Sequence, residues 1–366
     1  MVFLADLPEG ENLMTYGLFG VQHGFLNPEK RKITADLYSL LVKSAGRVDH
    51  LQDQTYGLPR EIPKSTTFVA YWLRSEEYQK WIETGPVKEF WASLSEDAGV
   101  WREVMTVPKS RFMHASSQNV KSGIATLLEL KHSTDEGYWG VYRHRLSAVP
   151  DNYTDPSDTF ASPWITSAKA DGTARKFVIN IPKSFVGNNI VFVREGQRQP
   201  HVSKEELDTW LESIAPHAKS WIEHLDTERN KNGVVAFTTH IGHESPAQNN
   251  LDLDPSVSLE VDSDAVAETN QLAYFLDLAH FEMAGRTHLG HVKLRKNTMT
   301  LYGPGGKMSM GKAVLYVELG YWADVFERSV GARLVFHSDQ VWKAIPGAYS
   351  YLSFSKFQSA SERTQV

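Results

Sequence analysis

The sequence predicts an α+β fold in which two ferredoxin-like β-α-β-β repeats pack as one body, in the manner of a dimeric α/β barrel. The first observation is that apolar segments of strand periodicity alternate with segments of helical periodicity along most of the 366 residues. The second is a weak internal repeat. Residues 66–81 and 270–285 both run from an apolar strand through a polar break into a helix. A chance similarity between two ordinary β-α units is the alternative.

The first half begins with an apolar strand over Tyr16–Gln22. A helix follows, because Asn27 is a typical N-cap residue, Pro28 suits the first helical position and Gly46 suits the helix end. Further elements of this half are a strand at Thr66–Leu73, a helix that begins near Ser75 and a strand at Trp101–Val107.

The second half repeats this alternation. Ser203 and Glu206 have the spacing of a capping box, which predicts the start of a helix. A later helix contains His288 and His291 and ends at the GPGG turn of residues 303–306, which lacks the lysine and hydroxyl of a phosphate loop. The expected strands are Tyr138–Leu146, Lys176–Ile181, Asn189–Arg194, Gly233–His240, Leu272–Leu278 and Ala313–Leu319, and the expected surface loops are residues 146–174 and 244–264.

These elements predict one domain over residues 15–345, made of two halves at about 15–118 and 137–345. Residues 1–14 are expected to be a polar leader and residues 346–366 a C-terminal tail. The start of the chain turns acidic before the apolar region of a signal peptide can form, and no run of about 18 apolar residues occurs. We therefore expect a cytoplasmic protein without a membrane partner.

Charge and cysteine content exclude several functions. The chain has 38 basic and 44 acidic residues, a net charge of −6, and no stretch that concentrates Lys and Arg. A nucleic-acid partner is not expected, because phosphate binding requires a basic face. The absence of cysteine excludes disulfides, a thiolate nucleophile, thiolate metal ligands and covalently attached haem. The 14 histidines are therefore the first candidates for chemistry.

Two groups of histidine positions are candidate sites. His288 and His291 are three residues apart and share a helix face, so they can share a metal, or one can bind it while the other lines a cavity. Packed or solvent-facing histidines are the alternative. In the strand that ends at His240, alternation puts Ala236, Thr238 and His240 on one face. This arrangement leaves room for a ligand beside an acid–base group, unless His240 only bonds to a loop.

Arg194 ends the apolar run of residues 190–193. A buried unpaired charge is costly, so Arg194 is expected to pair either with a carboxylate, as a structural ion pair, or with a ligand oxygen.

Several segments between about residue 15 and residue 345 resemble one known family. These segments are GYWG at 137–140 with YRHR at 142–145, NIVFVREGQ at 189–197 and HLGH at 288–291. They resemble segments of the haem-containing aldoxime dehydratases and occur in the same order as in that family. Three further segments resemble the fungal, phenylacetaldoxime dehydratase-like members of the family. They are FWASLSEDAGVWRE at 90–103, HVKLRK at 291–296 and YGPGGKM at 302–308. GYWG alone is a weak signal, whereas several segments in the shared order are a strong one.

The resemblance implies a lyase that converts an aldoxime, R–CH=N–OH, into a nitrile and water. The implied cofactor is non-covalent haem b in its ferrous form, with the substrate nitrogen on iron. By position, His291 is implied as the axial metal ligand and Arg194 as the hydrogen-bond donor to the oxime oxygen. Lys293 and Arg295, which follow His291 on the expected helix, are cations suited to the haem propionates, and either one can reach a propionate. The resemblance also implies a homodimer.

At two positions the chain departs from the bacterial members of that family. Ala236 and Val317 stand where those members have a distal serine and an acid–base histidine, so both are expected to line the cofactor pocket together with Thr238. His240 is then the titratable group left to protonate the leaving hydroxyl. The alternatives are a haem peroxidase or oxygen-using enzyme on the same fold, and a non-catalytic haem-binding protein. The preferred aldoxime stays open.

Overall fold

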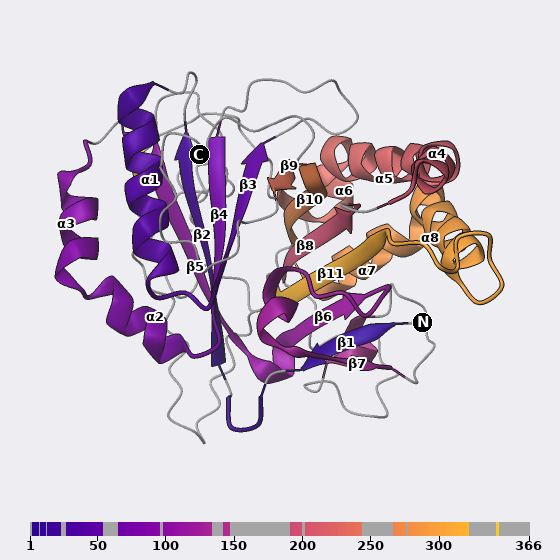
Figure 1. Cartoon of the computed structure of the whole chain (residues 1–366), viewed down its shortest axis with the longest axis horizontal. Coiled ribbons are helices and arrows are strands. Elements are labelled where there is room, and N and C mark those ends of the chain that lie inside the picture. Colours follow the sequence, from indigo (N-terminus) through magenta and orange to yellow (C-terminus); the bar gives the residue numbers. More distant parts are fainter. Residues whose placement is uncertain are drawn as a thin grey trace, which may run out of the picture.

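The computed structural model of the chain describes residues 2–6, 8–11, 13–22, 27–53, 65–95, 98–133, 142–146, 191–199, 202–243, 266–275, 277–321 and 342–343. In this part of the chain the strands form one antiparallel sheet, and two groups of helices cover separate regions of it (Figure 1). The architecture is therefore α+β, as the sequence predicts.

The first unit of the fold has four strands hydrogen-bonded in the order β5-β2-β4-β3. Its three helices lie together on one side of these strands (Figure 1). In chain order the elements are β2 (Leu13–Gln22), α1 (Pro28–Val42), β3 (Arg47–Asp53), β4 (Ser65–Trp72), α2 (Ser75–Ile82), α3 (Gly85–Ser93) and β5 (Val100–Pro108).

The second unit has the same succession of strands, hydrogen-bonded in the order β9-β10-β8-β11. Its helices again lie together on one side (Figure 1). In chain order the elements are β8 (Val191–Arg198), α4 (Lys204–Ser213), α5 (Ala215–Thr227), α6 (Arg229–Asn232), β9 (Val234–His243), β10 (Val266–Phe275), α7 (Leu278–Thr287), α8 (Leu289–Tyr302) and β11 (Val314–Tyr321).

The two units join edge to edge, because β3 pairs with β9. Strand β6 (Phe112–Ser116) extends the sheet beyond β11, β1 (Phe3–Asp6) lies between β6 and β7 (Glu129–His132), and β12 (Trp342–Lys343) pairs with β5. Strand β1 lies within residues 1–14, so the expected polar leader contributes a strand to the sheet. The described residues also form short 3₁₀ turns at Lys109–Arg111, Gly123–Leu127 and Tyr142–Arg145.

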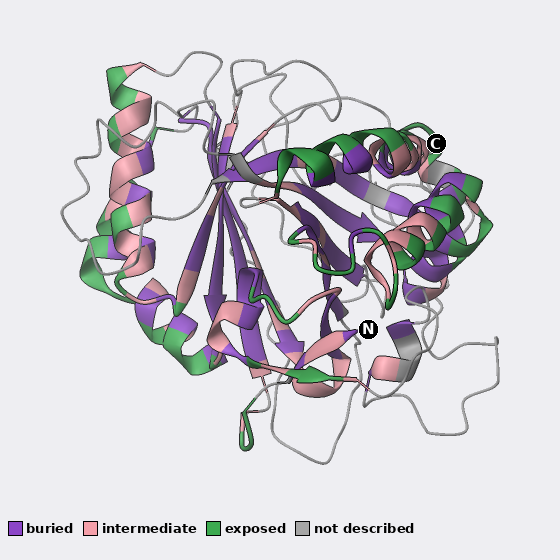
Figure 2. Ribbon diagram, turned by 45° about the vertical axis from the view of Figure 1, so that its right-hand side comes forward, coloured by how far each residue is buried: buried purple, intermediate pink, exposed green. Residues whose placement is uncertain are grey.

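The core has an interior layer, two layers between the sheet and the helices, and a smaller cluster that packs α4, α5 and α8 together. The interior layer contains apolar side chains of both units, such as Tyr16 of β2 and Phe192 of β8, whose ring centroids are 5.6 Å apart. One outer layer packs α1–α3 on the first unit, and the other packs α5 and α7 on the second. Figure 2 shows most of the strands buried, with the edge strand β7 as an exposed exception, and the helices exposed on their far sides. The sheet therefore curls so that its two units face each other.

Local sequence signals explain where the helices begin. The side chain of Asn27 accepts a hydrogen bond from the Lys30 amide at 2.8 Å, and that of Ser203 accepts one from the Glu206 amide at 3.1 Å. The expected capping box is only half formed. The Glu206 carboxylate instead accepts from the amides of Lys312 and Ala313 at 2.7 and 2.8 Å, just before β11.

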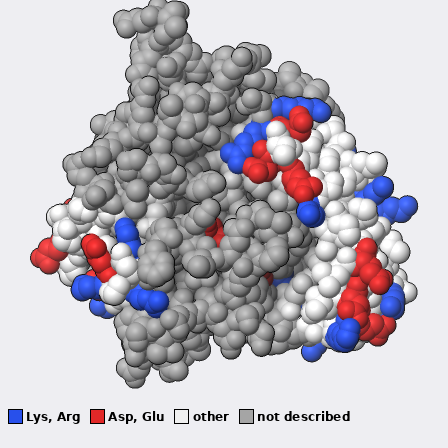
Figure 3. Space-filling view, turned by 90° about the horizontal axis from the view of Figure 1, so that it is seen from above, with Lys and Arg blue, Asp and Glu red and all other residues white. Residues whose placement is uncertain are grey.

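The charged side chains on the helices are of mixed sign where the described residues are visible in Figure 3. One such pair is Lys204 and Asp208 on α4, 2.7 Å apart, and exposed pairs of this kind add little stability. None of the described helices has both the length and the apolar stretch needed to cross a bilayer.

Some of the predicted elements lie outside the described residues. These are the strand Lys176–Ile181, the loop 244–264, nearly all of the loop 146–174, the GYWG segment and the tail 346–366. The strand expected over Tyr138–Leu146 is corrected for its described part, because Tyr142–Arg145 form a 3₁₀ turn.

Gly20 of β2 gives the first testable prediction. A Cβ at this position would lie 2.0 Å from the buried indole ring of Trp101. We expect Gly20→Ala to lower the free energy of unfolding by about 1–3 kcal/mol, the usual cost of overpacking a core. Gly85→Ala is the control, since a Cβ there has no neighbour within 4 Å. Denaturant unfolding of both variants measures the difference, and equal stabilities would contradict this packing.

Candidate functional site

The sheet of the second unit has two faces with different surroundings. Because side chains alternate along a strand, Phe192 and Arg194 of β8 point to one face, and Val193 and Glu195 point to the other. We call the first the inner face, since Phe192 packs there on Tyr16 of the first unit. We call the second the outer face, since Val193 packs there with side chains of α5 and α7.

His291 lies in the first turn of α8, on the helix side of the outer face. The residue is 7% exposed, and its ring packs on the indole ring of Trp221 of α5, with a centroid separation of 4.5 Å. Its Nδ1 lies 2.6 Å from the carbonyl oxygen of Gly285. A carbonyl can only accept, so Nδ1 donates the ring proton and Nε2 keeps its lone pair. Burial lowers the pKa of His291 to about 4, and the ring is therefore neutral at pH 7.

His288 has a different position from His291. It is the N-cap residue of α8, and its Nδ1 accepts a hydrogen bond from the His291 amide at 3.2 Å. Its ring stacks on that of His224 at 4.3 Å. The expected single helix is thus two helices, α7 and α8, that meet at His288, and the two histidines do not form a ligand pair on one face.

Four side chains form a row across neighbouring strands on the outer face. Val317 of β11 is opposite Glu195 of β8, Glu195 is opposite Gln271 of β10, and Gln271 is opposite Thr239 of β9. Opposed residues of neighbouring strands have Cβ atoms about 4.5–5.5 Å apart. The row therefore places a carboxyl group and an amide group side by side, next to Val317.

Glu195 is connected to His291 through Trp221. The indole Nε1 of Trp221 donates to Oε2 of Glu195 at 3.1 Å, while the same indole packs on the His291 ring. Burial raises the pKa of Glu195 to about 7, although the hydrogen bond from Trp221 opposes the rise. The amide nitrogen Nε2 of Gln271 is buried and has no hydrogen-bond partner among the described residues. This part of the outer face thus has a carboxyl group that titrates near neutrality and an unused donor.

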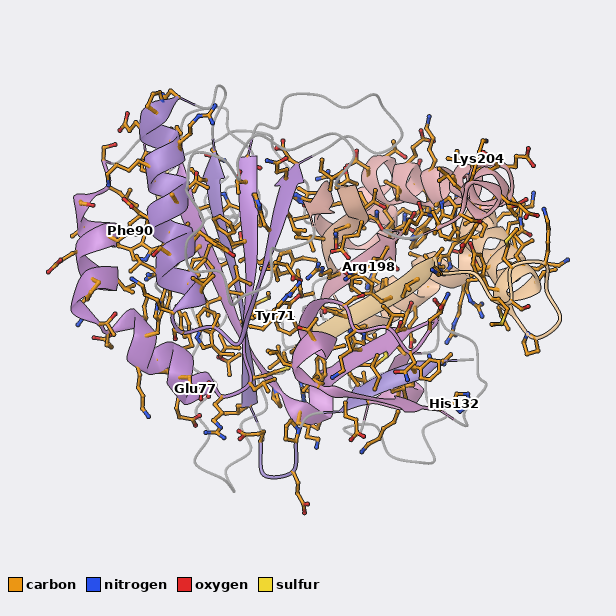
Figure 4. The ribbon with its side chains drawn as sticks, in the orientation of Figure 1. Tyr71, Glu77, Phe90, His132, Arg198 and Lys204 are labelled. Atoms are coloured by element: carbon orange, nitrogen blue, oxygen red, sulfur yellow. The ribbon has the colours of Figure 1, made fainter. Side chains whose placement is uncertain are left out.

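Arg194 lies on the inner face and is fully buried. Its Nη1 is 2.5 Å from Oδ2 of Asp49 in β3, its Nη2 is 2.8 Å from Oε1 of Glu268, and its Nε is 2.8 Å from Oδ1 of Asn270. It also donates to the hydroxyl of Tyr71, which lies near the middle of the molecule between the two units (Figure 4). The sequence left two alternatives for Arg194, an ion pair with a carboxylate or a contact with a ligand oxygen, and the structure confirms the ion pair.

His240, Ala236 and Thr238 also lie on the inner face. Ala236 belongs to the interior apolar layer, and Thr238 Oγ1 is 3.1 Å from Nε2 of His240. Burial, with a further contribution from Arg194, lowers the pKa of His240 to about 3. The structure therefore does not bring Arg194 or His240 together with His291, because the sheet itself separates them.

Comparison with known proteins shows the family to which the chain belongs. The model of one family, the haem-containing dehydratases, matches residues 17–323. The chain belongs to this family. Two relatives are the phenylacetaldoxime dehydratase of Bacillus sp. (strain OxB-1), 21% identical over 72% of this chain and 67% of its own length, and an aliphatic aldoxime dehydratase of Pseudomonas sp., 23% identical over 61% of this chain and 63% of its own length.

Two crystal structures of aldoxime dehydratases have the same fold as this haem-containing dehydratase. One is a complex with butyraldoxime, with a TM-score of 0.65 and 16% identity over 88% of this chain and 83% of that chain. The other has a TM-score of 0.64 and 15% identity over 88% of this chain and 85% of that chain.

The residues of this haem-containing dehydratase around His291 fit a haem held by one histidine. A ligating histidine usually donates its other ring N–H to a carbonyl or carboxylate, as His291 does to Gly285. A Cβ on Gly285 would lie 3.1 Å from the His291 ring, so glycine permits this close approach. Arg295, one turn along α8, is near enough to lower the pKa of His291, whereas Lys293 is exposed. Val317 is buried in the apolar layer of the outer face.

The sequence analysis missed three residues of this site, namely Glu195, Gln271 and Trp221. Strand alternation could have assigned Glu195 to the face opposite Arg194. No signal in the sequence gives the register that places Glu195 beside both Val317 and Gln271.

Proposed function

We propose that this protein is an aldoxime dehydratase, which converts R–CH=N–OH into R–C≡N and water with haem b held by His291. Membership of the haem-containing dehydratases supports the proposal. The observation in this chain that supports it most is the neutral, buried His291 ring, whose Nδ1 donates to Gly285 and whose Nε2 keeps its lone pair.

When bound, ferrous haem supplies an iron atom that takes the substrate nitrogen. The protein contributes the rest of the site. Trp221 packs on the His291 ring and restricts its orientation. Val193 and Val317 belong to the apolar layer of the outer face, which excludes water and favours an apolar R group on the substrate. Arg295 and Lys293 on α8 are proposed partners of the haem propionates, with Arg295 on the side of His291.

Several narrower conclusions are part of the proposal. The strand orders β5-β2-β4-β3 and β9-β10-β8-β11, with helices on one side of each unit, support two ferredoxin-like repeats. The remaining parts of the proposal rest on the sequence alone. They are a single haem-binding catalytic domain over residues 15–345, kinship with the fungal members, a homodimer and a cytoplasmic location.

The proposed function is tested with the purified full chain loaded with haem. We expect a Soret band and, after reduction with dithionite, conversion of phenylacetaldoxime into its nitrile, measured by chromatography. An aliphatic substrate such as butyraldoxime, assayed in parallel, tests the preference for R. Haem binding without nitrile formation would overturn the proposal, and peroxide-driven dye oxidation in the same sample would favour a peroxidase instead.

A further inference from the structure

We propose that Glu195 is the acid–base group of the dehydration, the residue that protonates the departing hydroxyl of the aldoxime. This inference rests on the proposed function and adds a catalytic residue to it. Neither composition nor the resemblance points to Glu195, which follows Arg194 in the chain.

The position of Glu195 is the first argument. It is on the outer face, the face packed under the helices that include His291, and it is opposite Val317 on the neighbouring strand. Trp221 of α5 connects Glu195 to the proposed haem ligand, because its indole N–H donates to Glu195 and its ring packs on that of His291.

The surroundings of Glu195 are the second argument. It lies in the middle of β8, with β10 and β11 on either side, yet its side chain stays partly exposed. Gln271, opposite Glu195, is buried with an unpaired Nε2 donor, which suits a substrate oxygen. The carboxyl and the amide thus offer a proton and a hydrogen bond to one small polar group.

The charge state of Glu195 agrees with this role. Burial raises its pKa to about 7, close to the pH at which an acid–base catalyst is most effective. Its neighbours Trp221, Gln271 and Val317 do not titrate, and the histidine rings that pack on Trp221 are those of His291, His288 and His224. The pKa of His240 is lowered to about 3, and His240 faces the other side of the sheet, so it is a poor proton donor at pH 7.

The proton transfers balance without a co-reactant. Protonated Glu195 gives its proton to the hydroxyl oxygen while the N–O bond breaks and water leaves with that electron pair. The electron pair of the C–H bond becomes the third C–N bond, and the Glu195 carboxylate takes the released proton. The products are one nitrile and one water, and Glu195 returns to its protonated form.

The test is Glu195→Gln in the haem-loaded enzyme. The glutamine has the same shape and its Oε1 can still accept from Trp221, so we expect wild-type haem content and Soret band. Nitrile formation should fall by at least about a hundredfold, within the range of general acid catalysis. Glu223→Gln, a matched change at an exposed position of α5, is expected to behave as wild type.

A second measurement does not depend on activity. A carboxyl whose pKa rises from its ordinary 4.5 to about 7 on folding binds more protons in the folded state. The stability of the haem-free wild type, relative to Glu195→Gln, should therefore fall as pH rises from about 4.5 to about 7 and stay constant above. Thermal unfolding across this range measures the difference.

The outcomes separate the two proposals. If the wild type makes no nitrile, the proposed function fails. If the wild type is active and Glu195→Gln is equally active, or if the stability difference does not change between pH 4.5 and 7, only the role of Glu195 is overturned. Should Glu195→Gln fail to fold, Glu195→Asp replaces it, with at least about tenfold slower turnover expected because the shortened carboxyl misses the substrate oxygen. Unchanged turnover of Glu195→Asp would overturn the role.

Discussion

His291→Ala should lose most of its haem and, with it, nitrile formation. His291 is the buried ring whose Nδ1 donates to Gly285 and whose Nε2 lone pair is available to iron. Loss of groups that only support a metal ligand typically costs 10–100-fold in affinity, so loss of the ligand itself should cost at least about tenfold. The haem content and Soret absorbance of the purified variant, compared with the wild type at equal protein concentration, measure the effect.

His288→Asn is the control for this experiment. His288 is the N-cap residue of α8 and accepts from the His291 amide, a role that asparagine can fill. We therefore expect His288→Asn to keep its Soret band. Equal haem loss in both variants, or loss only in His288→Asn, would reverse the assignment of the ligand.

Arg194→Met should unfold far more easily than the wild type, rather than lose activity in a stable fold. The fully buried guanidinium neutralises Asp49 and Glu268, which lie on different units of the sheet. Burial alone would raise the pKa of Asp49, but Arg194 and Arg47 hold that pKa below its ordinary value. Removing one partner of a buried ion pair typically costs about 3–5 kcal/mol, which denaturant unfolding of the haem-free protein would detect.

Arg74→Met is the control for the buried ion pair. Arg74 pairs with Glu11 at 2.7 Å on the surface, with its side chain 60% exposed, so we expect no measurable loss of stability. A stable Arg194→Met that binds haem but makes no nitrile would show instead that Arg194 acts on the substrate, as the resemblance implies.

The pH dependence of stability should also report the Asp49–Arg194 pair. A carboxyl whose pKa is lowered on folding stabilises the protein above its ordinary pKa, and that contribution disappears as the pH falls through the lowered value. In Arg194→Met this acid-dependent contribution should be reduced.

Much of the local structure could be predicted from the sequence. The strand of β2, the N-cap at Asn27 and the helix start at Ser203 follow from short-range patterns of apolar, capping and turn residues. The strand expected to end at Arg194 is also present, but it continues to Arg198. Such patterns act within a few residues of each other, so they need no knowledge of the rest of the chain. The family, too, was recognisable, because ordered segments such as HLGH at 288–291 are themselves part of the sequence.

The composition of the site was decided only by tertiary structure. Alternation puts Arg194 and Glu195 on opposite faces of β8, but the sequence does not state which face the helices cover. That depends on the partner of Arg194, which is Asp49, 145 residues away in the other unit. Likewise, Glu195 meets Gln271 and Val317 only through the register of three strands that are distant in sequence.

The physical reason is the cost of burying charge. A guanidinium needs carboxylates when it is buried, and the interior between the two units supplies them, so Arg194 is drawn inward and Glu195 faces outward. A one-residue shift of β8 would exchange the two side chains and leave both without these partners. The sequence by itself therefore determines many of the strands and helix starts and names His291 as the proposed haem ligand, and the pairing of the sheet determines that Glu195, not Arg194, lies on the side of the sheet that the helices cover.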